Sequence, residues 1–397
     1  MRVSTRGAYE HGLSAMQRLQ SALDHTQRQI SSGRRILTPS DDPIAASRAL
    51  QIRESIGRLS QFDRNSNIAA NRLSQEESAL NSVNNVLQRV RELALQANNA
   101  TQSNESRQQI AVEMRQQLDQ LVQLANQKDG NGAFLFAGTS EGVQPVTRTG
   151  SSFTYNGDQN QRFIQIGEGR SIADGNSGAA VFFEIRNGNG VFSSTAASTN
   201  TGTGVAGAGT LTNPSAWVPD QYTIRFIDSA NYEVLDSAAA VVSSGAYQPG
   251  DTISFNGIEL ALSGQPQAAD EFIVAPSRNQ SIFSSVAQLI SSVEQSVTDE
   301  RSQALVNNGI NTSLLNIDRA IGNMLDIRTQ IGSRLSAIES QRDSNGAFAL
   351  SYQETLASIE DLDYAEALSR LSIEATTLEA AQQSFIRTQS LSLFNYF

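Results

Sequence analysis

Cysteine is absent from the 397 residues of this chain, and histidine occurs only twice, as His11 and His25. Without thiols the protein forms no disulfide, uses no thiol nucleophile and offers no cysteine ligand to a metal. The two histidines are separated by about 21 Å if they share a helix, so they do not share a metal ion. We therefore expect no catalytic residues, no metal site and no cofactor, and we expect the protein not to be an enzyme.

Charge is also scarce. Charged residues make up 17% of the chain, against about 25% in an average soluble domain, and the net charge is −11. Lys128 is the only lysine. An acidic chain is repelled by phosphate backbones and anionic lipids, so we exclude nucleic acid and membranes as main partners.

Long hydrophobic runs are missing as well. No stretch approaches the roughly 18 consecutive apolar residues of a membrane span. Residues 1–10 lack the apolar core of a secretory signal. We expect a protein that stays in the cytoplasm or leaves the cell without a cleaved signal peptide.

Glycine and proline crowd the middle of the chain. Twenty of the 28 glycines and six of the eight prolines fall within residues 130–276. Because both residues interrupt helices, the ends are predicted to be long helices and the middle to be strands and turns. The expected fold class is α+β, with a long coiled-coil-like helical bundle built from both chain ends and an inserted mostly-β domain.

The first helices carry apolar residues at heptad spacing. In the first helix the stripe consists of Tyr9, Met16, Leu19, Leu23 and Ile30. Gly33 suits a left-handed C-cap, and Asp42 and Pro43 suit the N-cap and first position of a second helix. The second helix keeps its register through Ile52, Leu59, Leu73, Leu80, Leu87 and Ala94, which indicates a coiled-coil seam.

The C-terminal third mirrors this pattern. A short helix over 282–293 precedes a register that runs from Leu314 to Ile359 and slips at residues 360–364. A new register follows through Leu368, Leu371, Ala375, Leu378, Gln382 and Phe385. The acidic residues at 360, 361 and 363 have no basic neighbour in the sequence, so we interpret them as a solvated break between helices.

Three domains are predicted. A terminal helical domain comprises residues 1–40 and 362–397, a helical bundle comprises 41–136 and 277–361, and a β-rich surface domain of one or two lobes comprises 137–276. Alternating apolar residues predict eight strands, at 153–155, 162–166, 181–185, 222–226, 232–235, 252–255, 258–262 and 271–274. Residues 193–212 are rich in Ser, Thr, Gly and Ala and are predicted to be a flexible loop.

The terminal helices need a partner outside the chain, because two helices of about thirty residues bury little apolar surface by themselves. We predict an assembly interface on the first stripe and on the last helix. The C-terminal set comprises Leu368, Leu371, Leu378, Phe385, Leu391, Leu393, Phe394, Tyr396 and Phe397.

Helical ends that pair around a β-rich middle resemble the flagellin superfamily. Residues 30–43 resemble the segment between its first two helices, and residues 360–367 resemble its C-terminal helix junction. The inter-helix positions are Gly33, Arg34, Asp41, Asp42 and Pro43. Residues 131–139, 323–335 and 391–397 resemble the hook–filament junction members more than flagellin itself.

This resemblance implies a structural protein that is exported unfolded through the flagellar type III export apparatus with an export chaperone. It implies a ring of identical copies on the extracellular flagellum, between hook-associated protein 1 and flagellin. A minor flagellin, or an extracellular adhesin with a β binding module on a helical stalk, are the alternatives. A zinc peptidase domain is excluded, because no histidine follows His25.

Limited proteolysis of the monomer tests the unpartnered ends. We expect residues 1–35 and 365–397 to be cleaved well before residues 43–128, since their stripes lack a partner within one chain. Mass spectrometry of the fragments reports the order of cleavage. Equal protection of the ends and of 43–128 would contradict the prediction.

Overall fold

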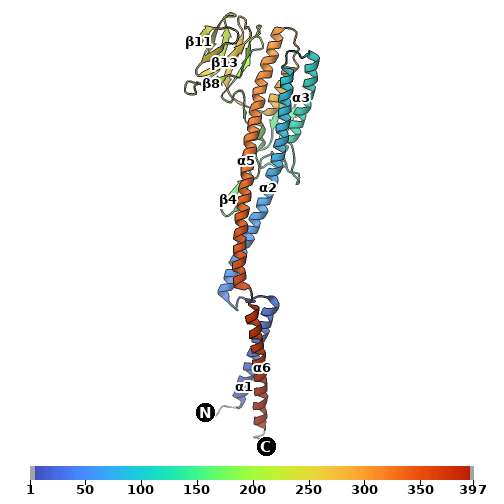
Figure 1. Ribbon diagram of the computed structural model, residues 1–397, viewed down its shortest axis with the longest axis vertical. Helices are drawn as coiled ribbons and strands as arrows, with labels where there is room; N and C mark the ends of the chain where they lie inside the picture. Colours follow the sequence, from blue (N-terminus) through green and yellow to red (C-terminus); the bar gives the residue numbers. More distant parts are fainter. Residues whose placement is uncertain (1–4, 394–397) are drawn as a thin grey trace. The chain divides into compact units, whose positions relative to one another are not determined.

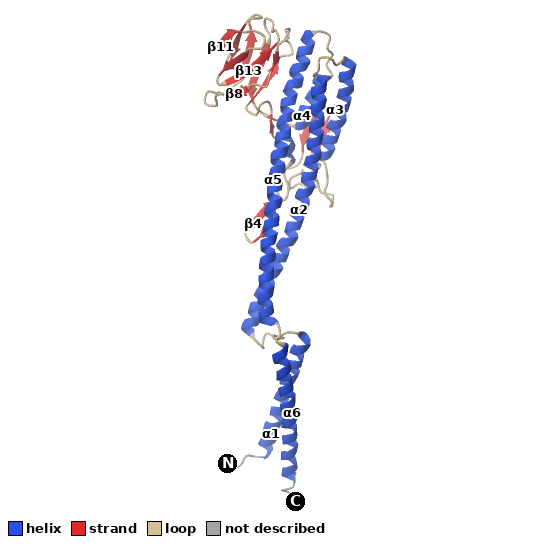
Figure 2. Cartoon of the chain, in the orientation of Figure 1, coloured by secondary structure: helices blue, strands red, loops and turns tan. Residues whose placement is uncertain are grey.

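The computed structural model describes residues 5–393 and divides the chain into two compact units, residues 1–64 with 340–397 and residues 65–339. The helices are α1 (Thr5–Ser32), α2 (Pro43–Ala97), α3 (Asn104–Ala125), α4 (Ile282–Val293), α5 (Glu300–Glu360) and α6 (Tyr364–Leu393). None of them, over the described residues, is long and apolar enough to cross a membrane. The α+β class is confirmed, with helices from both chain ends and strands between them (Figure 2). The three domains predicted from the sequence have boundaries that differ from those of these two units, and that division stays a prediction.

The first unit contains α1 and α6 side by side, together with the first turns of α2 and the last turns of α5 (Figure 1). Asp42 caps α2, because its carboxylate accepts a hydrogen bond from the Ala45 N–H at 2.9 Å. Asp363 caps α6 by accepting from the Ala365 N–H at 2.9 Å. The helices therefore begin at Pro43 and Tyr364, and the predicted slip of register at 360–364 is confirmed.

The second unit is built on a bundle of α2, α3, α4 and α5. The heptad positions predicted in its part of α2 are buried, as are their interleaved partners: Ala69, Leu73, Leu80, Val83, Leu87, Val90, Ala94 and Ala97. In α5 the buried counterparts are Val306, Ile310, Ile317, Met324, Ile331 and Ile338. Each large side chain buried in this way contributes about 1.5–3 kcal/mol of hydrophobic free energy, so the seam is the main stabilising feature of the bundle.

Two hairpins and a helical turn pack onto the bundle core. The hairpins are β1 (Val146–Thr149) with β2 (Ser152–Tyr155), and β3 (Phe163–Gly167) with β4 (Arg170–Ala173). The strand predicted at 181–185 is wrong, because residues 179–183 form the π-helical turn η1. The Glu184 N–H donates to the Ala179 carbonyl at 2.9 Å, which closes the turn, and Val181 and Phe182 are both buried.

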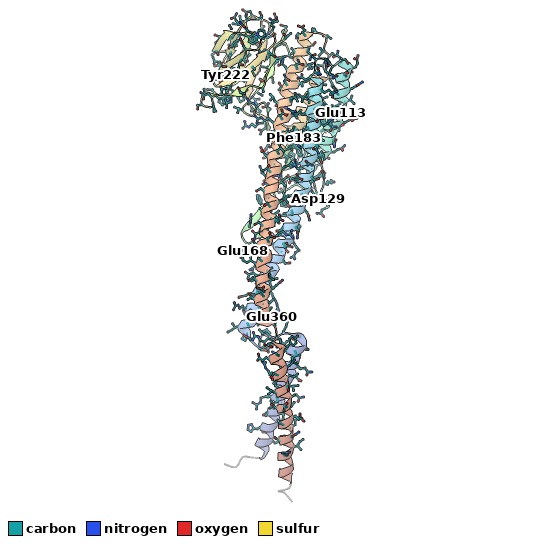
Figure 3. The ribbon with its side chains drawn as sticks, in the orientation of Figure 1. Glu113, Asp129, Glu168, Phe183, Tyr222 and Glu360 are labelled. Carbon is teal, nitrogen blue, oxygen red and sulfur yellow. The ribbon has the colours of Figure 1, made fainter. Side chains whose placement is uncertain are left out.

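The remaining strands form a β-sandwich with a core of its own. Its strands are β6 (Phe192–Ala196), β7 (Val205–Ala206), β8 (Thr210–Leu211), β9 (Tyr222–Phe226), β10 (Asn231–Leu235), β11 (Val241–Ala246), β12 (Thr252–Phe255), β13 (Ile258–Ser263) and β14 (Glu271–Pro276). One antiparallel sheet has the order β11-β10-β9-β14-β6, and the other has β12-β13-β7, with β8 also paired to β13. Tyr222, labelled in Figure 3, lies in the shared core.

The flexible loop predicted at 193–212 is wrong. This segment contains β6, β7 and β8, and the buried Asp270 carboxylate accepts hydrogen bonds from Thr201 N–H at 2.6 Å and Gly202 N–H at 3.0 Å. Asn308 of α5 donates to the Gly204 carbonyl at 2.9 Å. The small residues of segment 193–212 let its backbone approach neighbouring groups closely, so main-chain hydrogen bonds fix the segment together with the few side chains that it buries.

The chain enters and leaves the sandwich at one place. β5 (Ile185–Arg186) precedes it and pairs antiparallel with β15 (Asn279–Gln280), which follows it. Asn187 accepts a hydrogen bond from the Arg278 N–H at 2.8 Å, and Ser277 N–H donates to the Val191 carbonyl at 2.8 Å. The two crossings between the sandwich and the bundle are therefore held together.

A buried carboxylate lies where the hairpin loops meet α2. Glu76 is 1% exposed and accepts hydrogen bonds from Asn176 Nδ2 at 2.8 Å and from the Asn176 N–H at 3.2 Å. Burial raises the pKa of Glu76 to about 7, against the opposing effects of Asn176, Arg334 and Arg72. Arg72 itself pairs with Asp129 at 3.2 Å.

Glu76 makes the stability of the second unit depend on pH. The folded protein holds the Glu76 proton up to a pKa of about 7, whereas the ordinary value is 4.5, so the folded state binds more protons between these values. Stability therefore falls by about 3 kcal/mol as the pH rises from about 4.5 to about 7. Glu76→Gln is expected to flatten the slope of the unfolding free energy against pH, measured by denaturant titrations from pH 5 to pH 8.

Glu77→Gln is the matched control. Glu77 is the next residue, but its side chain is partly exposed and pairs with Arg328 at 2.7 Å. It is expected to keep the slope of the wild-type protein. If the unfolding free energy of Glu76→Gln depended on pH as steeply as that of the wild-type protein, Glu76 would not be the source of the pH dependence.

Candidate interface: the terminal helix pair and its junction

The two terminal helices meet along part of the predicted stripes. Met16, Leu19, Leu23 and Ile30 of α1 are half-buried, and so are the α6 residues Leu371, Leu378 and Phe385. The rings of Tyr9 and Phe385 lie 5.2 Å apart between centroids. The α6 stripe therefore faces α1 through its 371, 378 and 385 positions.

The other predicted positions of α6 point away from α1. Leu368 is 54% exposed, and Ala375 and Gln382 are also exposed. Ile373 and Ile386, which the heptad analysis did not single out, are 64% and 65% exposed. Leu368, Ile373 and Ile386 lie on more than one side of α6, so the helix pair presents apolar side chains to its surroundings beyond the single face that a heptad stripe predicts.

The packing within the pair is thin. Among the described side chains of α1 and α6, only Thr26, Gln29 and Ala367 are buried, and two of these three are polar. More than half of the exposed large apolar side chains among the described residues lie in the first unit, which holds less than a third of the chain. Exposed apolar surface at this density is typical of a protein–protein interface.

The aromatic terminus lies beyond what can be described. Leu391 and Leu393 belong to α6, but their side chains are outside the described part of the structure. Phe394, Tyr396 and Phe397 also lie outside the described residues. Their assignment to the interface stays a prediction.

Gly33 joins the two segments that link the helices. Its φ angle is +70° and its N–H donates to the Gln29 carbonyl at 2.9 Å, so the predicted left-handed C-cap of α1 is confirmed. Its carbonyl accepts from the Leu362 N–H at 3.1 Å. A Cβ at this position would lie 2.9 Å from the Tyr364 hydroxyl, so a larger residue is disfavoured by both strain and space.

The other inter-helix positions shape the turn into α2. The Asp41 carboxylate accepts hydrogen bonds from the N–H groups of Thr38 at 2.8 Å and Leu37 at 2.9 Å, and the Thr38 bond lowers the pKa of Asp41. Arg34 forms an isolated antiparallel bridge with Asp361. Asp42 and Pro43 start the helix as the sequence predicts.

The acidic residues do mark a break between helices, and Asp361 and Asp363 are exposed, but Glu360 is not a free solvated acid. Glu360, labelled in Figure 3, pairs with Arg53 at 2.5 Å, and Asp363 is the α6 cap. Arg35 donates from Nη2 to the Ile359 carbonyl at 2.9 Å. These basic partners lie more than 300 positions away in the chain, so no local sequence pattern identifies them.

The arrangement offers apolar side chains for association. No cluster of three or more His, Asp or Glu side chains that could hold a metal occurs in the described part of the chain. What the first unit presents is an apolar helix surface beside a hydrogen-bonded junction.

Comparison with known proteins gives a consistent result. Residues 3–141 match the bacterial flagellin N-terminal helical region, and residues 314–397 match the bacterial flagellin C-terminal helical region. The chain is 24% identical over 394 residues to flagellar hook-associated protein 3 of Escherichia coli, and the match covers 99% of both chains. It is similar to the crystal structures of Xanthomonas campestris FlgL and of Legionella pneumophila flagellar hook-associated protein 3. Their identities are 32% and 34%, their TM-scores are 0.73 and 0.76, and the matches cover 77% and 78% of this chain and 99% and 98% of those chains.

Two glycines of the first unit test the junction. Gly33→Ala is expected to destabilise the protein by about 1–2 kcal/mol, because alanine is strained at positive φ. Gly57→Ala, in the α2 helix, is the matched control: its Cβ would meet no atom within 4 Å, and the helix gains about 0.5–1 kcal/mol. Thermal unfolding followed by circular dichroism measures both. Equal unfolding temperatures for the two variants would show that Gly33 is not constrained as described.

Proposed function

This chain belongs to the flagellin family, and from that premise we propose that it forms the adaptor ring between hook-associated protein 1 and the flagellin filament. Its role in the flagellum is structural. The match over 99% of the chain is to a protein named flagellar hook-associated protein 3, and the structures of FlgL and hook-associated protein 3 match over 77% and 78% of it, which supports the junction rather than the filament as its place.

The observation that carries this proposal is the thinly packed terminal helix pair. A pair that buries few of its own side chains while exposing Leu368, Ile373 and Ile386 is only marginally stable by itself, and other chains that cover these side chains stabilise it further. Copies of the same chain arranged in a ring supply such a cover, because each copy offers the same surface to its neighbour in turn.

The proposed interface uses residues from both helices. On α1 it comprises Tyr9, Met16, Leu19, Leu23 and Ile30. On the C-terminal side it comprises the positions predicted from the sequence, Leu368, Leu371, Leu378, Phe385, Leu391, Leu393, Phe394, Tyr396 and Phe397, together with the exposed Ile373 and Ile386. Gly33, Arg34, Asp41, Asp42 and Pro43 form the segment that connects this interface to the bundle.

The proposed layout has three domains. Residues 1–40 and 362–397 line the central channel, residues 41–136 and 277–361 form the surrounding tube, and residues 137–276 face solvent. The proposed partners are further copies, hook-associated protein 1, flagellin, an export chaperone and the type III export apparatus. The proposed location is the extracellular hook–filament junction, reached without a cleaved signal peptide.

Exposed apolar residues of α6 provide the test. Leu368→Ser with Ile373→Ser is expected to leave the unfolding temperature of the monomer nearly unchanged, since both side chains are exposed. Attachment of filaments should fall by more than about 100-fold, because covering two such side chains contributes several kcal/mol per copy. Each variant is expressed in cells from which the wild-type copy is deleted. Electron microscopy then counts the filaments attached to these cells.

Ile227→Ser is the matched control, because Ile227 is 58% exposed at the end of β9 in the sandwich. It is expected to support normal attachment. Normal attachment by the α6 double variant would refute the interface. Growth of long filaments by the purified protein alone would instead favour the minor flagellin.

A further inference from the structure

Glu360 occupies an unfavourable place for a carboxylate. It is the last residue of α5, where the aligned peptide dipoles of the helix leave a partial negative charge. Its side chain is only 12% exposed, so water stabilises it little. A nearby cation must offset both costs, and Arg53 of α2 does so at 2.5 Å.

The same residue also ties the linking segment through its backbone. The Glu360 carbonyl accepts a hydrogen bond from the Arg35 N–H at 2.7 Å. The Leu362 N–H donates to Gly33 at 3.1 Å on the other side of the Arg34–Asp361 bridge. Glu360 therefore connects three segments of the first unit: the end of α5, the linker 33–42 and the start of α2.

Little apolar burial supports this junction. None of the described side chains in linkers 33–42 and 361–363 is buried. Apolar packing is non-directional, whereas hydrogen bonds and ion pairs have preferred geometry. The direction in which α1 and α6 leave the linkers is therefore set by polar contacts.

We propose that Arg53 and Glu360 form a clasp that positions the α1–α6 pair relative to the adjoining turns of α2 and α5, all within the first unit. Both residues are positioning residues, since they lie in the joint and not on the exposed apolar surface of α6. The use of the clasp in ring assembly rests on the proposed function, but its control of geometry is a property of the single chain.

The absence of cysteine makes a direct measurement possible. Gln17→Cys on α1 and Gln51→Cys on α2 are both exposed positions and allow two spin labels without competing thiols. Pulsed electron paramagnetic resonance on the monomer then gives the distribution of distances between the labels. We expect one narrow distribution in the otherwise unchanged chain, and a distribution at least twice as broad after Glu360→Gln or Arg53→Gln.

The double variant Arg53→Glu with Glu360→Arg exchanges the positions of the two charges. It is expected to restore the narrow distribution, because a cation and a carboxylate still face each other. Arg58→Gln is the matched control: it removes an exposed ion pair with Glu54, 3.3 Å long and confined to α2, and should leave the distribution narrow. Circular dichroism verifies that each variant keeps its helices.

Unchanged widths in both single variants would overturn the clasp, and so would an exchanged pair as broad as the single variants. Because the monomer is measured, either outcome leaves the ring proposal standing. A failure of filament attachment experiments, conversely, leaves the clasp standing.

Discussion

The structure depends on one constraint: the first and last helices of the chain must find each other. α1 and α6 come from opposite ends of the sequence, and neither has another helix of its own chain to cover its stripe. Their contact buries few side chains, so it is supported by the capped and hydrogen-bonded linkers at its base. The same thin contact leaves Leu368, Ile373 and Ile386 uncovered. The thin contact between α1 and α6 and the exposed apolar side chains of α6 thus have the same cause.

The bundle behaves differently, because its stability is internal. Leu73, Leu80 and Leu87 of α2 are fully buried in one core with apolar side chains of α3, α4 and the first half of α5. Polar side chains also join parts of the bundle. Glu76 accepts a hydrogen bond from Asn176, and Arg328 pairs with Glu77. Low overall charge therefore does not mean that charge is unimportant. The few buried charges are concentrated where loops and helices must be joined.

Sequence reasoning succeeded where the physical signal is periodic and local. The heptads predicted the seam of α2 and α5, and the cap residues Gly33 and Asp42 mark helix ends that the structure places at the same positions. It failed where the signal is spread over the chain or carried by the backbone. Nothing near Glu360 in the sequence points to Arg53, and nothing in residues 193–212 shows that Asp270 and Asn308 bind their main chain. At Val181 the apolar residues are strand-like in composition, yet the backbone forms a π-helical turn.

The paired strands β5 and β15 have a consequence for how such chains can differ from one another. Because the chain enters and leaves the sandwich at neighbouring points, the whole segment between Asn187 and Ser277 is inserted like a side branch on the bundle. A branch of another size, or none, could close the same two strands without altering the length or phase of any helix. The size of the sandwich is in this way uncoupled from the length and phase of the helices.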